Sequence, residues 1–153
     1  MALRGRGATV VELAIVLVIL GLLLAFALPY LTSRPMNLRA DTNDLVANLR
    51  LARDLAISRT THYRLRAVDC SSYVIEKGVL GPDGDAWEFR EERRVSLREN
   101  VRFQGPPCGG SVEFDSRGRV VRSTSRGVFV LEDPSRGEQR TVSVSSVGGV
   151  SEP

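Results

Sequence analysis

The longest apolar stretch of the chain lies close to its N-terminus. From Leu13 to Leu28 no side chain is charged or strongly polar, and the wider segment 8–28 has 21 residues. As a helix it would be about 31 Å long, which matches a hydrocarbon core of about 30 Å. The pattern therefore predicts a transmembrane helix over residues 8–30.

A second helical pattern follows in the polar part of the chain. Apolar residues recur there at the spacing of one helix face, at Leu38, Leu45, Leu49, Ala52 and Ala56. The spacing predicts an amphipathic helix over 37–60, which needs a partner to cover its apolar stripe. Pro35 precedes this helix and predicts a break or flexible joint between the membrane segment and the soluble part.

Beyond residue 60 the periodicity changes from helical to alternating. Residues 63–68 alternate apolar and basic side chains, and 72–77 follow after a short turn, so the two segments predict a β-hairpin. Further short strands are predicted at 86–90, 93–97, 101–103, 111–115, 119–122, 128–131 and 140–147. The pattern predicts an α+β fold, with the N-terminal helix packed on an antiparallel β-sheet built from residues 61–147.

Charge on either side of the apolar stretch predicts its orientation. Arg4 and Arg6 precede it, and the next basic residue is Arg34. The positive-inside rule keeps such an N-terminus cytoplasmic and places residues 31–153 outside as one small globular domain. A secretory signal peptide, cleaved after Ala25-Phe26-Ala27, is the alternative interpretation, although its apolar region would be long and would contain an acid.

The chain has two cysteines, Cys70 and Cys108, both beyond the predicted membrane helix. An oxidising compartment favours a disulfide between them, with two buried thiols as the alternative. His62 is the only histidine, so the sequence predicts no metal site, no catalytic residues and no cofactor. Asp83-Gly84-Asp85 has too few carboxylates for a calcium loop and predicts a plain turn.

The N-terminal junction is the most specific motif of the chain. A short basic leader ends at Gly7, and Glu12 is the only acid in the apolar stretch that follows. This arrangement resembles the processing site of type IV pilins and type II secretion pseudopilins. Three later segments resemble the GspH/FimT family of minor pseudopilins and minor pilins, namely 47–59, 112–119 and 140–149.

The resemblance implies a structural subunit rather than an enzyme. Members are made as bacterial inner-membrane precursors, and prepilin peptidase removes the leader, here residues 1–7, between Gly7 and Ala8 and methylates the new N-terminus. The mature chain then joins other minor subunits and the major pilin, at the tip or in the initiation complex of a secretion pseudopilus or a type IV pilus. Ala8 departs from the family pattern, in which Phe or Met is usual.

Glu12 requires compensation inside an apolar helix. An ionised carboxylate there costs about 2.5 to 3.5 kcal/mol on insertion scales. After cleavage, the amino group of Ala8 in the same or a neighbouring chain could pair with Glu12, and the resemblance implies that this pairing sets subunit register. Alternatively, Glu12 lies shallow enough to reach the headgroups.

Binding of DNA during natural transformation is the alternative function, because some pilus-side relatives bind DNA through basic residues. The candidate contacts are Arg117, Arg119, Arg122 and Arg126. Without Arg4 and Arg6 the chain has 19 basic and 18 acidic side chains, and the C-terminal segment 148–153 has no arginine. The arginine runs of the strands also alternate with acids, which favours solvated strand faces over a phosphate-binding surface. These acids are Glu88, Glu91, Glu92 and Glu99.

Overall fold

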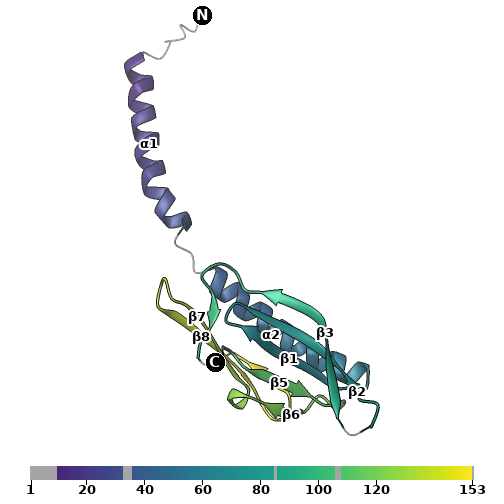
Figure 1. Ribbon diagram of the computed structural model, residues 1–153. Coiled ribbons are helices and arrows are strands. Elements are labelled where there is room, and N and C mark those ends of the chain that lie inside the picture. Colours follow the sequence, from purple (N-terminus) through teal and green to yellow (C-terminus); the bar gives the residue numbers. More distant parts are fainter. Residues whose placement is uncertain (1–9, 33–35, 85, 106–107, 153) are drawn as a thin grey trace, which may run out of the picture. The chain divides into compact units, whose positions relative to one another are not determined.

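The computed structural model describes residues 10–32, 36–84, 86–105 and 108–152, with side chains in the first helix described as far as Leu23 (Figure 1). The chain divides into two compact units, 1–35 and 36–153. The predicted leader, its cleavage point at Gly7 and Ala8, and the predicted break at Pro35 lie outside the described residues.

The first unit contains helix α1 (Val10–Thr32). Its described side chains are exposed and, apart from Glu12 and Gly21, all apolar, as expected for a segment without a soluble core of its own. Over the part of the chain that the structure describes, no helix is long and apolar enough to cross a membrane. The transmembrane assignment of residues 8–30 stays a prediction from the sequence.

The second unit begins with α2 (Met36–Ser58), which confirms the predicted amphipathic helix with an earlier end. The helix ends because Thr60 adopts a left-handed conformation with φ of 50°. The backbone N–H groups of Thr60 and Thr61 then donate to the carbonyls of Ile57 and Ala56, which closes the last turn.

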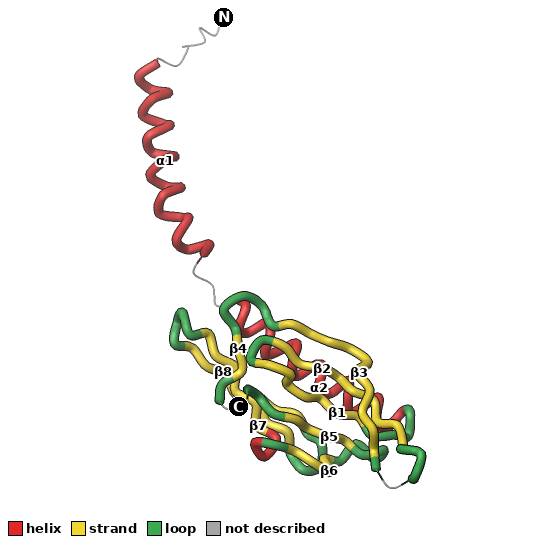
Figure 2. Tube along the Cα trace, viewed as in Figure 1, coloured by secondary structure: helices red, strands yellow, loops and turns green. Residues whose placement is uncertain are grey.

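The larger sheet is antiparallel, with strand order β3-β2-β1-β5-β6 (Figure 2). Its strands are β1 (Tyr63–Asp69), β2 (Ser72–Leu80), β3 (Trp87–Ser96), β5 (Ser111–Phe114) and β6 (Val120–Ser123). The predicted hairpin is confirmed as β1 and β2. The two strands predicted at 86–90 and 93–97 are a single strand, β3. A register shift opposite Ile75 and Glu76 leaves Glu92 unpaired, so the alternation along the strand is interrupted there.

A smaller sheet has the order β4-β7-β8-β9. Its strands are β4 (Arg102–Phe103), β7 (Val128–Asp133), β8 (Glu138–Val144) and β9 (Val150–Ser151), and a short 3-10 turn, η1 (Ser125–Gly127), precedes β7. The sequence predicted neither the division into two sheets nor β9, because a two-residue strand has no alternation to detect.

The core of the second unit lies between α2 and both sheets. Leu38, Leu45, Leu49, Ala52 and Ala56 are all buried, which confirms the predicted stripe, and α2 contacts β1 and β5 of one sheet and β7, β8 and β9 of the other. The core is completed by Val101, just before β4, and by buried sheet residues, namely Tyr63, Leu65, Tyr73, Ile75, Phe103, Val112, Phe114, Phe129, Leu131, Val142 and Val144.

Polar side chains of α2 also hold the sheets. Asn48 Nδ2 donates to the hydroxyl of buried Tyr73 at 2.7 Å, and burial raises the pKa of that hydroxyl to about 12. Arg53 Nε donates to the carbonyl of Gly118 at 3.1 Å, in the turn between β5 and β6. Asp41 accepts the backbone N–H of Arg98, just after β3, at 2.8 Å. The helix is therefore fixed along its length by directional bonds as well as by apolar packing.

The turn between β8 and β9 lies tightly against the turn between β5 and β6. Gly148 has φ of +80°, and a Cβ atom there would lie 2.0 Å from the carbonyl oxygen of Gly118. Only glycine allows the two backbones to approach so closely.

We therefore expect Gly148→Ala to lower the free energy of unfolding by about 3 kcal/mol, because the methyl group adds a backbone clash to an unfavourable φ. Gly137→Ala is the matched control, since Gly137 has φ of +67° but open space around it. It should cost about 1 kcal/mol. Chemical denaturation of the two variants measures both values, and equal losses would contradict the close approach.

A disulfide joins Cys70 and Cys108, as predicted, across a separation of 38 residues. It connects the turn between β1 and β2 to the loop that precedes β5. A covalent loop of this length restricts the unfolded chain and so stabilises the folded one.

Reduction with dithiothreitol should lower the free energy of unfolding by about 2 to 4 kcal/mol, from the lost restriction on the unfolded chain. Thermal unfolding with and without reductant provides the measurement. A variant with both Cys70→Ser and Cys108→Ser should show the lower stability under both conditions. A response of this variant to reductant would attribute the effect to something other than the disulfide.

Candidate functional site

The first candidate site is the start of α1. Glu12 lies in the first described turn of the helix, where the helix dipole favours a carboxylate. This position gives Glu12 a source of electrostatic compensation that the sequence pattern alone did not predict.

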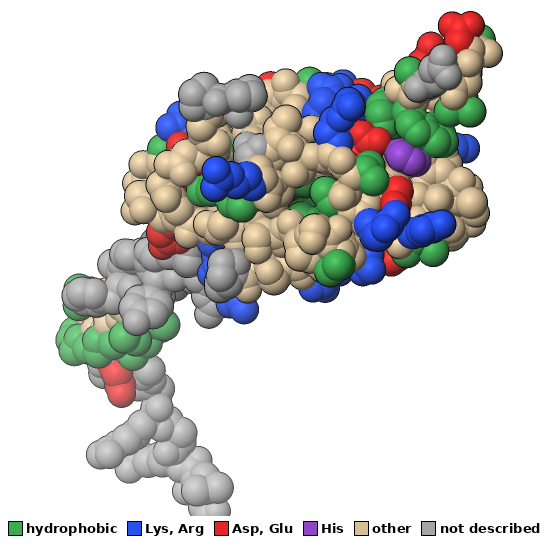
Figure 3. All heavy atoms as spheres, turned by 90° about the horizontal axis from the view of Figure 1, so that it is seen from below, with side chains coloured by type: hydrophobic (Ala, Val, Ile, Leu, Met, Phe, Trp, Pro, Cys, Tyr) green, Lys and Arg blue, Asp and Glu red, His purple; other side chains and the backbone are tan. Residues whose placement is uncertain are grey.

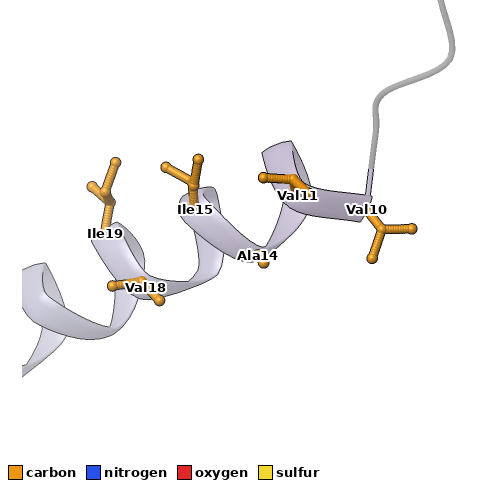
Figure 4. Close-up of a pocket in the computed structure, with 6 residues that line it drawn as sticks. All are labelled: Val10, Val11, Ala14, Ile15, Val18 and Ile19. Atoms are coloured by element: carbon orange, nitrogen blue, oxygen red, sulfur yellow. The ribbon is translucent and has the colours of Figure 1, made fainter.

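Helix α1 also presents an apolar surface in its first turns. Figure 4 shows Val11, Ile15 and Ile19 along one side of α1 and Val10, Ala14 and Val18 along an adjacent side. The four-residue spacing places each triplet on one stripe of the helix. Half or more of each large side chain among them is exposed, so the first unit itself does not cover this surface.

The four arginines predicted as DNA contacts come from the β5–β6 turn, β6 and η1. Arg117 and Arg119 lie in the turn after β5, Arg122 lies in β6, and Arg126 lies in η1. The structure brings them to neighbouring segments, but the arginines differ in what they contact.

Arg119 is held by Asp115. Its Nε and Nη2 donate to Asp115 Oδ2 at 3.1 and 3.0 Å, and the backbone N–H groups of Arg117 and Arg119 donate to Oδ1. Burial alone would raise the pKa of Asp115, but these hydrogen bonds outweigh it and hold the pKa below its ordinary value. The carboxylate of Asp115 therefore holds the turn together, and the guanidinium of Arg119 is engaged in that structural role.

The β2 strand contributes a buried acid to the face of the larger sheet opposite α2. Glu76 alternates with Ile75, which packs in the core, so its side chain lies on the other face. Arg64 donates to Glu76 Oε2 at 2.6 Å and Arg66 donates to Oε1 at 2.7 Å. Burial opposes ionisation of Glu76, but the two arginines outweigh it and lower its pKa. This face of the sheet is ordered by charge pairs.

A surface pocket of about 330 Å³ lies on the same face of this sheet, lined by residues from β3, β5 and β6 and by His62. In Figure 3 the histidine, purple, lies at the surface beside apolar, acidic and basic side chains. The sequence pattern did not predict this pocket. In the sequence, His62 is an isolated histidine. No sequence motif indicates that Trp87, Glu113 and Arg122 lie close to it in the folded chain.

The described residues contain no group of three or more His, Cys, Asp and Glu side chains that could hold a metal ion. The acidic turn at Asp83 is only partly described, because residue 85 lies outside the described residues.

Solved structures with a similar fold are bacterial filament subunits. The type IV minor pilin FimU of Pseudomonas aeruginosa matches with a TM-score of 0.55 at 19% identity, covering 76% of this chain and 92% of FimU. The minor pseudopilin EpsH of the Vibrio cholerae type 2 secretion system matches with a TM-score of 0.54 at 16% identity, covering 76% of this chain and 96% of EpsH. No curated protein sequence matches the chain.

A sequence comparison gives the family directly. The model of the family described as type II transport protein GspH matches residues 41–148, which include most of α2 and every strand except β9. This match covers more than half of the chain and falls on the unit whose fold FimU and EpsH share. The chain therefore belongs to the GspH family of minor pseudopilins and minor pilins.

Proposed function

We propose that this chain is a membrane-anchored minor subunit that takes part in starting or capping a type II secretion pseudopilus or a type IV pilus. The observation that carries the proposal is α1, an apolar and exposed helix with one acid in its first turn, in a chain whose other unit has the GspH-family fold. Such a helix needs either lipid or other helices around it.

The membrane supplies that environment before assembly. α1 has 23 residues, about 35 Å of helix at 1.5 Å per residue, and the basic leader before it favours a cytoplasmic N-terminus. The chain would be a single-pass inner-membrane protein with residues 36–153 in the periplasm. The disulfide between Cys70 and Cys108 suits that oxidising compartment.

In the filament, α1 would pack against the corresponding helices of other minor subunits and of the major pilin. The two stripes of α1 offer apolar area to neighbours, and Glu12 offers a charge that an adjacent processed N-terminus could pair with. A carboxylate within an apolar helix penalises registers that keep it away from a cation of the neighbouring subunit. Glu12 would thus set the axial position of α1 against its neighbours, and the apolar stripes would supply the buried contact area.

DNA uptake has less support among the candidate residues. The guanidinium of Arg119 is already hydrogen-bonded to Asp115. Of the predicted set, Arg117, Arg122 and Arg126 are then left to contact phosphates. Few free cations give a weak electrostatic term for duplex binding, because that term grows with each phosphate neutralised.

Processing by prepilin peptidase is the first test of this proposal. Intact mass and N-terminal sequencing of the membrane-extracted protein should give a start at Ala8 in cells that have the peptidase and the full-length precursor in cells that lack it. A start at Leu28 in both strains would mean cleavage by signal peptidase, and α1 would then be absent from the mature protein.

The role of Glu12 is tested by Glu12→Ala. We expect membrane levels to be maintained, because the change removes a charge from an apolar helix. The amount recovered in sheared filaments should fall about tenfold or more, since a lost pairing of 1.4 kcal/mol already changes an equilibrium tenfold.

Glu138→Ala is the matched control for that experiment, because Glu138 is an exposed acid at the start of β8 in the other unit. It should leave incorporation into filaments unchanged. Normal incorporation of the Glu12→Ala variant would remove Glu12 from the assembly mechanism.

A further inference from the structure

Two of the residues that line the pocket on the larger sheet, His62 and Trp87, lie against a glycine. Gly78 in β2 lies beneath His62 and Trp87, and a Cβ atom there would be 3.0 Å from His62 Cβ and 3.1 Å from Trp87 Cε3. The backbone N–H of Gly78 donates to the carbonyl of His62 at 2.8 Å. The missing side chain lets the two rings stack over β2, with centroids 4.2 Å apart and planes 16° apart.

The wall of the pocket is aromatic and held in place. Trp87 is fixed by its stacking on His62. Phe89 lies two residues further along β3, and the guanidinium of Arg64 covers one side of its ring, with Cζ 4.0 Å from the ring centroid. Val121 from β6 adds an aliphatic side chain that is 50% exposed. These groups form a rigid apolar surface that solvent can reach.

One acceptor and one cation lie beside that wall. Glu113 is 8% exposed, and His62 Nδ1 lies 2.8 Å from its Oε1, so a ring N–H there donates to the carboxylate. Its other oxygen has no hydrogen-bond partner among the described residues, and it is not sealed from solvent. It can accept a hydrogen bond from a ligand.

Arg122 is the cation. It is paired in register with Glu113 across β5 and β6, but no described carboxylate lies within 4.0 Å of its guanidinium. The neighbouring Arg64 is already paired with Glu76. Among the described lining residues, Arg122 is therefore the cation without a carboxylate within ion-pair distance, which favours a carboxylate as its ligand.

We propose that this pocket binds an extended acidic peptide segment of a partner subunit, with an apolar residue and an acidic residue two positions apart. In an extended strand such residues lie on the same face, about 7 Å apart. The apolar side chain would contact Trp87 and Phe89, the carboxylate would pair with Arg122, and a peptide N–H would donate to Glu113. That the partner is a filament subunit rests on the proposed function, whereas recognition of the segment rests on the pocket alone.

Trp87 is the only tryptophan of the chain, so its fluorescence reports on this pocket. The probe is an acetylated and amidated pentapeptide with phenylalanine second, glutamate fourth and serine elsewhere, titrated into the full chain in detergent. We expect a saturable change in fluorescence. The same peptide with glutamine fourth should bind about tenfold more weakly, because it lacks the charge for Arg122.

Arg122→Ala should abolish the preference for the glutamate peptide. Arg126→Ala is the matched control, an exposed arginine in η1 that does not line the pocket, and it should keep the preference. Circular dichroism checks that both variants are folded.

The proposal is overturned by the absence of a saturable change, by equal affinity for the two peptides, or by an Arg122→Ala variant that keeps the preference. Maltotriose is titrated in parallel as a neutral glycan. Saturation by the glycan without saturation by the peptide would also overturn the proposal and assign the pocket to sugars. If the chain is processed by the peptidase but binds no peptide, the peptide-binding proposal is rejected and the filament role is retained. If the chain binds the peptide but is not processed, the filament role is rejected and the peptide-binding proposal is retained.

Discussion

The second unit depends on the burial of one helical stripe against two sheets. Leu45, Leu49 and Ala52 are fully buried, and α2 contacts strands of both sheets. Neither sheet has another helix to cover it among the described residues, so the stripe of α2 provides the apolar surface on which both close. Small side chains in the C-terminal half of the stripe, at Ala52 and Ala56, allow a close approach of the strands there.

The opposite face of the larger sheet is stabilised differently. Glu76 is buried between Arg64 and Arg66, and Glu113 is buried beside His62. A buried carboxylate is tolerated only when it is paired and hydrogen-bonded, and the described side chains contain no sealed polar atom without a partner. This face is consequently an ordered array of charges and rings, which can hold the geometry of a shallow pocket without a second helix.

Much of the fold could be predicted from the sequence because its signals are local. The spacing from Leu38 to Ala56 is enough to predict α2, and the alternation at Tyr63 to Ala67 is enough to predict the hairpin. The bulge at Glu92, the division into two sheets and β9 depend on pairing between distant segments, which no local pattern encodes.

The pocket could not be predicted from the sequence for the same reason. His62, Trp87, Glu113 and Arg122 come from segments up to 60 residues apart, and only strand order brings them together. The N-terminal motif, by contrast, can be recognised from its sequence, although its cleavage point lies outside the described residues.

The disulfide would have a mechanical consequence in the proposed filament, where the chain would be pulled through its N-terminal helix. The bond between Cys70 and Cys108 encloses β2, β3 and β4, so tension along the chain bypasses residues 71–107 between the cysteines. At about 3.4 Å per residue, the enclosed segment would otherwise contribute roughly 130 Å of extension. A domain under such tension can lengthen only through the strands outside the disulfide loop. The hairpin of β2 and β3 lies inside the loop and carries none of the tension.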